Sequence, residues 1–186
     1  MISSIPILSL LIWTPILGGL ILLFLPNKDF IVKISSIFLA FLTFVISIVL
    51  LFNFDTTQYS LQYTEKYTWI KNLDINYHLA VDGFSLAFIL LTTSITFLTV
   101  IYNFSENRSQ DNKYNALFLF LEGLLLGVFC ALDSILFYIF FEAMLIPLFL
   151  IIGIWGSRER KVRAAYQFFL YTLVGSLFIL LAILLI

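Results

Sequence analysis

The sequence predicts an all-α integral membrane protein with six transmembrane helices. Of its 186 residues, 62% are hydrophobic and only 11% are charged, whereas an ordinary soluble domain has about 25% charged residues. The apolar residues form blocks of about twenty, the length that a helix needs to cross roughly 30 Å of hydrocarbon. Membrane barrels have short segments of alternating polarity instead, so these continuous runs indicate helices.

The six apolar runs define a single membrane domain over residues 1–186. The first run is longer than a signal-peptide core and lacks a basic leader and a cleavage pattern, so we interpret it as a retained span. Between the second and third runs lies a polar loop, 53–79, in which Thr- and Tyr-rich stretches such as Tyr63 to Ile70 favour short paired strands. The expected helices are at about 5–25, 31–52, 80–102, 114–132, 134–154 and 164–186.

The basic residues predict the orientation of the chain. Loops on the cytoplasmic or matrix side retain Lys and Arg during insertion. Only Lys66 and Lys71 lie in the loop 53–79. We therefore expect both termini and this loop on the opposite side from the other basic residues, which follow the first, third and fifth spans: Lys28, Lys33, Arg108, Lys113, Arg158, Arg160, Lys161 and Arg163.

Several classes of function are disfavoured by composition. Cys130 is the single cysteine, and no Cys or His cluster has the spacing of a zinc, iron–sulfur or haem site. We therefore expect no metal, cofactor or redox centre in this chain. A net charge of −1 gives no sign of a nucleic-acid partner, and the expected surroundings are membrane lipids.

Glu142 lies close to the middle of the fifth span and is the first candidate for proton transfer. A charged group at mid-membrane costs about 2.5 kcal/mol or more, so such groups usually serve a pathway or a pair. The alternative is a protonated Glu142 in a structural hydrogen bond. Pro147 removes one backbone hydrogen bond nearby, which either admits water beside the carboxylate or only kinks the helix for packing.

Burial raises the pKa of a glutamate and a nearby lysine lowers it, so a movable cation would make Glu142 a switch. With Lys33 assigned to the loop after the first span, we expect no Lys or Arg inside the spans. We therefore expect the controlling cation of Glu142 to come from outside this sequence.

Glu122 occupies the centre of the fourth span and is the second candidate for proton transfer. Gly123 and Gly127 follow it in a small-xxx-small pattern that allows a neighbouring helix to approach closely. Glu122 is therefore expected at a helix contact, where it serves either a proton path or a buried structural hydrogen bond.

Other polar residues favour structural roles. Asp133 and Asp82 precede the fifth and third spans, where a carboxylate can cap a helix start. The sixth span carries polar residues at helical spacing, which we interpret as a face packed against protein: Tyr166, Gln167, Tyr171, Thr172 and Ser176.

Together these segments resemble subunit 4 of respiratory complex I, a member of the antiporter-like proton-translocating family. The resemblance covers essentially the whole chain and is carried by Val81-Asp82-Gly83, by the run from Phe129 to Pro147, by Trp155 to Arg160, and by Phe169 to Ser176. It implies that Glu142 is the family's fifth-helix carboxylate, which works with a lysine on the seventh helix. It also matches Glu122 to a fourth-helix carboxylate present in some members.

The family continues beyond the sixth helix, so the resemblance implies that this chain is the N-terminal part of an antiporter-like bundle. We expect a split-gene product, with a second chain carrying the remaining helices, in preference to a fragment. The implied function is proton translocation coupled to NADH:ubiquinone oxidoreduction in the mitochondrial or bacterial inner membrane. FMN, iron–sulfur clusters and quinone are then expected in other subunits. The alternatives are a subunit of a cation/proton antiporter or membrane-bound hydrogenase, and a structural membrane scaffold without transport.

Overall fold

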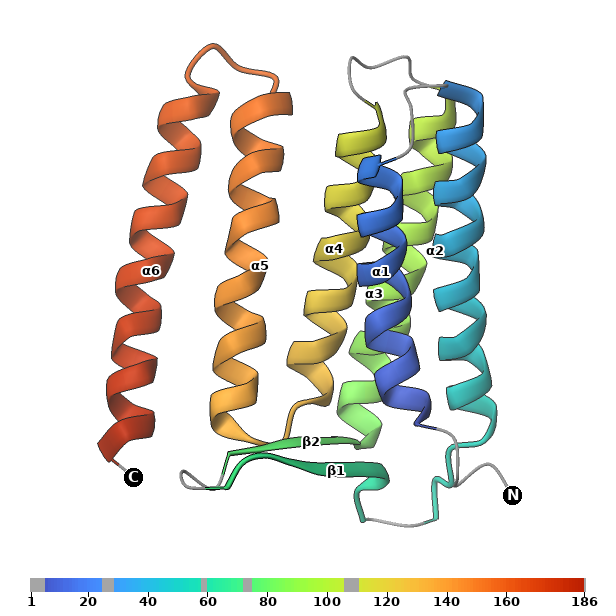
Figure 1. The fold of residues 1–186 in the computed structure, drawn as a ribbon, viewed down its shortest axis with the longest axis vertical. Helices are drawn as coiled ribbons and strands as arrows, with labels where there is room; N and C mark the ends of the chain where they lie inside the picture. Colours follow the sequence, from blue (N-terminus) through green and yellow to red (C-terminus); the bar gives the residue numbers. More distant parts are fainter. Residues whose placement is uncertain (1–5, 25–28, 58–59, 72–74, 106–110, 186) are drawn as a thin grey trace.

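The computed structural model describes residues 6–24, 29–57, 60–71, 75–105 and 111–185. Within these ranges six helices are long and apolar enough to cross a membrane, which confirms the predicted fold class. A two-stranded sheet lies at one end of the helices (Figure 1). The elements are α1 (Ile7–Phe24), α2 (Asp29–Phe52), β1 (Gln62–Ile70), β2 (Ile75–Val81), α3 (Gly83–Ser105), α4 (Asp111–Cys130), α5 (Ser134–Trp155) and α6 (Lys161–Leu185).

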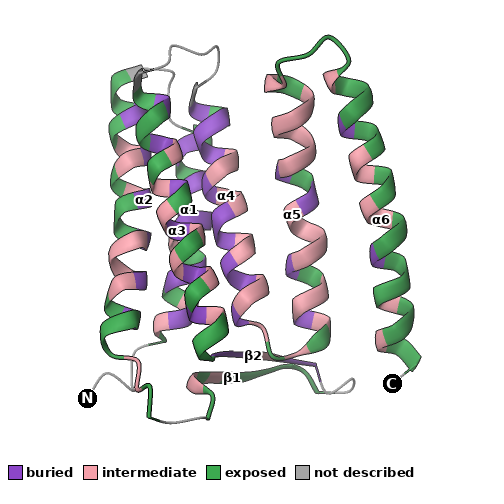
Figure 2. Cartoon of the chain, turned by 180° about the vertical axis from the view of Figure 1, so that it is seen from behind, coloured by how far each residue is buried: buried purple, intermediate pink, exposed green. Residues whose placement is uncertain are grey.

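Helix α4 lies at the centre of the fold. It contacts α1, α2, α3 and α5, whereas α6 packs only against α5 among the described helices. Half of the apolar window of α4 is buried, but only 6% of that of α6. Figure 2 shows the same difference, because buried positions concentrate in α1 to α4 and α6 is mostly exposed. The molecule is thus a four-helix bundle flanked by the pair α5–α6.

The two glycines of α4 explain how its neighbours come so close. A Cβ added at Gly123 would lie 2.5 Å from Cγ1 of Ile16 on α1. A Cβ added at Gly127 would lie 2.6 Å from Cδ1 of Phe140 on α5. Both contacts are shorter than carbon atoms tolerate, so α1 and α5 approach α4 only because these residues lack a side chain. This confirms the predicted close helix contact.

The polar segment between α2 and α3 contains a β-hairpin. Strand β1 pairs antiparallel with β2, and the predicted strand from Tyr63 to Ile70 is confirmed. Strand β2 also binds the segment between α4 and α5. Leu79 pairs with Ala131 in an isolated bridge, and the Leu132 N–H donates to the His78 carbonyl at 2.9 Å. The hairpin therefore covers one end of the bundle.

Several helix ends differ from the predicted ones by one to three residues, among them the starts of α2 and α4 and the ends of α3 and α5, and three of the differences have a physical reason. Helix α3 begins at Gly83 instead of Ala80, because residues 80 and 81 pair in strand β2. Helix α4 ends at Cys130 instead of Leu132, where the bridge to β2 begins. Helix α6 begins at Lys161 instead of Ala164, because its first turn is polar and extends beyond the apolar run. The predicted ends Ile5, Leu25 and Ile186 lie outside the described residues.

The prediction that the spans contain no Lys or Arg is wrong at Lys33. This residue lies near the start of α2 and is 6% exposed. Its Nζ donates to the Phe104 carbonyl at 3.2 Å. A long flexible side chain can bury its stem and reach the polar end of a neighbouring helix, so one cation lies inside the bundle.

The described basic residues outside the hairpin gather at one end of the bundle. Lys33 and Lys113 lie near the starts of α2 and α4, and residues 158–163 span the end of the α5–α6 connection and the first turn of α6. All these elements meet at the end opposite the hairpin (Figure 1). Lys28 and Arg108 lie outside the described residues. We call this the basic end below, and the other the hairpin end.

Candidate functional site: two intramembrane carboxylates

Glu142 lies on α5 at the seam with α6, where it is half-buried. The Tyr138 hydroxyl, one turn earlier on α5, donates to Glu142 Oε1 at 2.9 Å. The Ser176 hydroxyl on α6 donates to the same oxygen. Ser176 is 1% exposed, so this contact is sheltered even though α6 is the least buried helix. The sixth span thus contributes one polar group directly to the predicted site.

The surroundings of Glu142 can serve either protonation state. A hydroxyl can donate or accept, so Tyr138 and Ser176 can hydrogen-bond to a carboxylate and also to a carboxylic acid. Helix α5 runs through Pro147, which has no N–H, so the Ala143 carbonyl beside Glu142 does not receive the usual helical hydrogen bond. The site therefore combines a titratable group, two hydroxyls and an additional backbone acceptor.

Glu122 is enclosed by the four-helix bundle. Its side chain is 0% exposed, and Thr43 Oγ1 on α2 lies 2.9 Å from its Oε1. Its other carboxylate oxygen, Oε2, is buried and has no hydrogen-bond partner within the described ranges. Because such an oxygen normally has a partner, Glu122 is an unsatisfied polar group in an otherwise well-packed region.

Thr43 has one hydroxyl proton and two acceptors at the same distance. The Ala40 carbonyl and Glu122 Oε1 both lie 2.9 Å from Thr43 Oγ1. When Glu122 is ionised the hydroxyl can donate to it, and when Glu122 is protonated the hydroxyl can turn to Ala40 and accept. A rotation of one hydroxyl thus accommodates both charge states of Glu122.

The two carboxylates do not form one cluster. In the part of the chain that the structure describes, Glu142 is bound by residues of α5 and α6, whereas Glu122 is bound by a residue of α2. Both predicted site residues are thus mid-helix carboxylates at helix contacts, but they belong to separate hydrogen-bond networks.

Sequence reasoning missed a buried polar stripe on α2. Ser36, Thr43 and Ser47 are all buried and lie seven and four residues apart, which places them on one helix face. Ser36 accepts from Asn115 Nδ2 on α4 at 3.3 Å, and the hydroxyls of Ser47 and Thr93 on α3 lie 2.9 Å apart. This spacing is visible in the sequence and could have predicted a polar face on α2.

A second missed residue is Glu65, which joins the hairpin to α1. Its carboxylate accepts from the Leu8 N–H at 2.8 Å, from the Ser9 N–H at 3.1 Å and from the Ser9 hydroxyl. Because free N–H groups point out of a helix start, a carboxylate there caps the helix. No local sequence signal links Glu65 to residues so far away in the chain.

Asp133 caps α5, as predicted, and also contacts the hairpin. Its Oδ1 accepts from the Ile135 and Leu136 N–H groups at 2.9 and 3.2 Å. Its Oδ2 accepts from the Asn76 N–H of β2 at 3.0 Å. Asp82 likewise caps α3, with Oδ1 accepting from the Ser85 N–H at 2.7 Å. This hydrogen bond holds the pKa of Asp82 below its ordinary value.

The other polar residues of α6 are less enclosed, although the ring of Tyr166 packs edge-on against Phe149 of α5 with centroids 5.3 Å apart. Tyr166, Gln167 and Tyr171 are exposed, and the Thr172 hydroxyl donates to the Phe168 carbonyl of its own helix at 2.8 Å. Within the described residues, only Ser176 of the predicted set is buried. The predicted polar face is thus open over most of its length.

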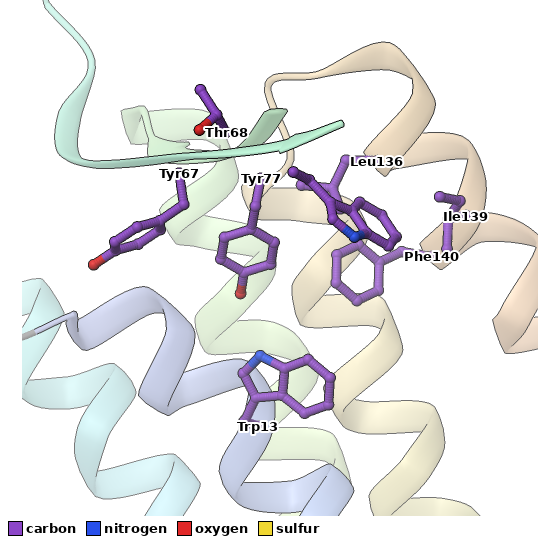
Figure 3. Close-up of a pocket in the computed structure, with 8 residues that line it drawn as sticks. Trp13, Tyr67, Thr68, Tyr77, Leu136, Ile139 and Phe140 are labelled. Atoms are coloured by element: carbon purple, nitrogen blue, oxygen red, sulfur yellow. The ribbon is translucent and has the colours of Figure 1, made fainter. Parts of the chain in front are cut away.

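An apolar pocket of about 390 Å³ lies at the hairpin end (Figure 3). Trp13 of α1 faces Tyr77 of the hairpin across it, and Phe140 of α5 forms its side. Its lining contains no carboxylate or lysine. Its polar groups are hydroxyls and indole N–H groups and not carboxylates, so the two mid-helix glutamates remain the candidate site.

Comparisons with known proteins agree with this geometry. The family model described as NADH:quinone oxidoreductase/Mrp antiporter, TM matches residues 131–186, which include Glu142 and Ser176. NADH-ubiquinone oxidoreductase chain 4 of Arabidopsis thaliana is 48% identical over 180 residues, covering 96% of this chain and 36% of the relative. NADH-quinone oxidoreductase subunit M of Rickettsia prowazekii is 36% identical over 184 residues, covering 97% of this chain and 37% of the relative.

A solved structure shows the same fold. Respiratory complex I from Thermus thermophilus with bound NADH contains a chain that matches with a TM-score of 0.81 and 31% identity, over 95% of this chain and 35% of that chain. The present chain spans about a third of the length of these relatives. Nearly the whole chain is thus similar to about a third of chain 4 of NADH-ubiquinone oxidoreductase, and residues 131–186 match the antiporter family model.

Proposed function

We propose that this chain is a membrane-arm subunit of respiratory complex I and contributes to proton translocation coupled to NADH:ubiquinone oxidoreduction. The observation that carries the proposal is the Glu142 site, in which a mid-membrane carboxylate is held by Tyr138 and Ser176 at the seam of α5 and α6. A titratable group at this depth usually serves an ion or proton path. The names of the relatives support complex I as the assembly.

In this function Glu142 takes up a proton and releases it as the charge around it changes. A cation that approaches the carboxylate favours its ionised form, and withdrawal of the cation favours protonation. Half-burial at the α5–α6 seam leaves Glu142 within reach of a group outside the described residues. By resemblance, this group is a lysine on the next helix of the family, supplied by a second chain or by further sequence.

The proposed assembly places the oxidoreductase chemistry elsewhere. FMN, iron–sulfur clusters and quinone belong to other subunits of the complex in this proposal, and this chain responds to them through charge on its membrane neighbours. Its partners are the other membrane subunits and the surrounding lipids. The expected location is the mitochondrial inner membrane, since chain 4 of Arabidopsis is named for ubiquinone; the bacterial inner membrane is the alternative.

Replacement of Glu142 by Gln tests the function. Gln keeps the shape and a hydrogen-bonding oxygen but cannot ionise, so titration is lost with little change in packing. We expect proton pumping and the coupled quinone reductase activity of the assembled complex to fall together, and far more than in Glu122→Gln. A native gel should show normal subunit content in both variants. Normal pumping in Glu142→Gln would mean that the carboxylate is only a structural hydrogen-bond acceptor.

The proposed orientation has its own test. We expect the basic end to face the matrix, or the cytoplasm in a bacterium, because four basic residues cluster within residues 158–163, at the α5–α6 connection and the first turn of α6. Ser157 is exposed in this connection. A cysteine at Ser157 should react with an impermeant thiol reagent only from the matrix side, and reaction only from the intermembrane side would invert the topology.

A further inference from the structure

A groove between α3 and α4 leads to the buried carboxylate of Glu122. It has a volume of about 240 Å³, and its lining includes Glu122, Thr92, Thr96 and Thr99. The remaining lining residues are leucine, isoleucine and phenylalanine. Thr96 is 8% exposed, so the middle of the threonine row lies under the apolar rim of the groove.

The polar groups of this groove act as acceptors. Each threonine uses its single hydroxyl proton on its own helix: Thr92 donates to Phe88 at 2.8 Å, Thr96 to Thr92 at 3.0 Å and Thr99 to Ile95 at 2.8 Å. Lone pairs of these hydroxyl oxygens remain free to accept. Oε2 of Glu122 is a further acceptor without a partner. Such a row requires a ligand that donates hydrogen bonds.

Water fits this requirement in size and in spacing. The groove exceeds by far the roughly 10–15 Å³ that a single water needs. Along α3 the threonines are four and three residues apart, which corresponds to about 6 and 4.5 Å of helix rise. One or two waters can therefore bridge each pair of hydroxyls and give the row a continuous set of hydrogen bonds.

The groove is closed toward the hairpin end and runs toward the basic end. The rings of Phe88 and Phe129 stack there with centroids 5.2 Å apart, and both residues line the groove. Thr99 lies in the half of α3 that leads to the basic end, about 9 Å of helix rise before Ser105. The threonine row thus extends from beside Glu122 toward the basic end.

We propose that this groove holds a short chain of waters through which Glu122 exchanges protons with the basic end, on a route separate from Glu142. A hydronium ion in the groove passes one proton to Oε2, leaving a water molecule and a neutral carboxylic acid. The Thr43 hydroxyl then turns from Glu122 Oε1 to the Ala40 carbonyl. Use of this step in pumping rests on the proposed function, whereas hydration of the groove does not.

A second groove on the same bundle provides a matched control. It has a volume of about 280 Å³, lies between α2 and α3, and is lined only by apolar residues, among them Phe41 and Phe97. Lipid tails should fill this groove, because it offers no hydrogen-bond partner to water. If lipid also filled the groove at Glu122, Phe118 in its lining would be as far from water as Phe41.

Hydroxyl-radical footprinting by X-ray pulses, read by mass spectrometry, distinguishes the two occupants in the intact wild-type complex. Radicals form from water, so side chains beside bound water are oxidised fastest. We expect Phe118 to be oxidised severalfold faster than Phe41, although Phe41 lies largely outside the protein core with 48% exposure. Equal rates for Phe118 and Phe41 would mean lipid in the groove and would overturn the proposal.

Replacement of Thr96 by Val removes one acceptor from the row and keeps the shape of the side chain. We expect the oxidation rate of Phe118 to fall severalfold toward that of Phe41 in Thr96→Val. It should stay unchanged in Thr172→Val, which removes a comparable hydroxyl from α6. An unchanged Phe118 rate in Thr96→Val would overturn the threonine route. Fast oxidation of Phe118 together with normal pumping in Glu142→Gln would instead overturn only the proposed function.

Discussion

Glu122 and Glu142 lie on the adjacent helices α4 and α5, yet this chain surrounds them to different extents. Glu122 is 0% exposed, with a threonine from α2 on one oxygen. Glu142 is half-buried, and both of its hydroxyl partners lie on the outer pair α5–α6. The Glu122 side chain is buried, but one of its oxygens has no hydrogen-bond partner among the described residues. The Glu142 side chain has two hydroxyl partners, but it remains partly exposed.

The difference follows from helix packing and indicates where each carboxylate receives its charge partner. Helix α4 contacts four other helices and meets α1 and α5 through Gly123 and Gly127, so this chain encloses Glu122 except along the groove between α3 and α4. Helix α6 contacts only α5 among the described helices, so the Glu142 seam is open to a further helix. We therefore expect changes in the residues packed around Glu122 to act within this chain, and changes around Glu142 to act on coupling with other chains.

The largest effect on the enclosed site is expected from Gly123→Ala. Its Cβ would meet Ile16 and, at 2.8 Å, the Ile12 carbonyl oxygen, so α1 has to move away from α4. Overpacking of this kind costs about 1–3 kcal/mol. The yield of assembled complex on a native gel should fall sharply. Gly175→Ala on α6 is the matched control, because no heavy atom of this chain lies within 4 Å of its added Cβ.

Removal of one hydroxyl from each site should separate the two environments. Thr43→Val leaves both oxygens of the buried Glu122 without a partner, which should destabilise the subunit by about 2 kcal/mol. Ser176→Ala should cost about 1 kcal/mol or less, because Tyr138 still donates to Glu142. Thermal dissociation of this subunit from the purified complex measures both. Equal losses would mean that the Glu142 seam is as tightly enclosed as the bundle.

The hairpin end provides a smaller perturbation that affects neither carboxylate. Glu65→Gln weakens three hydrogen bonds to the start of α1, at an expected cost of about 1.5 kcal/mol. Amide hydrogen exchange in β1 should rise, while pumping by the assembled complex stays normal. Lys66→Gln, at an exposed neighbouring position, is the control and should leave exchange unchanged.

Asp82→Asn should have the smallest effect. Asn can still cap α3, so the loss is mainly that of a negative charge near a helix start, about 0.5 kcal/mol. The pKa of Asp82 is lowered in the folded chain, so its contribution is present above the unfolded pKa and disappears as the pH falls through the folded pKa. Acid unfolding curves should therefore show a slightly weaker pH dependence in Asp82→Asn below the ordinary pKa of an aspartate, about pH 4.

The helices and both carboxylates were predictable because each contrasts with its surroundings. A run of twenty apolar residues can only be a span, and Glu122 and Glu142 are conspicuous inside such runs. Asp133 was predictable as a cap for a similar reason, since it separates two apolar runs. In each case the evidence lies within a few residues of the feature itself.

The partners of these groups were not predictable, because they come from distant parts of the chain. Thr43 and Ser176 are ordinary in a membrane helix, where a hydroxyl usually donates to its own backbone, and only packing brings them to Glu122 and Glu142. Glu65 lies in a polar segment, where a carboxylate is unremarkable. Lys33 lies at the margin of an apolar run, and hydropathy cannot show that its side chain turns inward along α3.

Two long-range contacts of the hairpin, which we call clamps, constrain the order in which the chain can fold during synthesis. Glu65 binds the start of α1, and Asp133 binds Asn76 of β2, each across 57 residues of sequence. During synthesis the first clamp can close once two helices and β1 have emerged, whereas the second must wait until α4 is in place and α5 begins. The Asn76 end of β2 would then be bound only when α5 begins to form. Because of these two contacts, the hairpin end of the bundle can be completed only after the first four helices and the start of α5 have been synthesised.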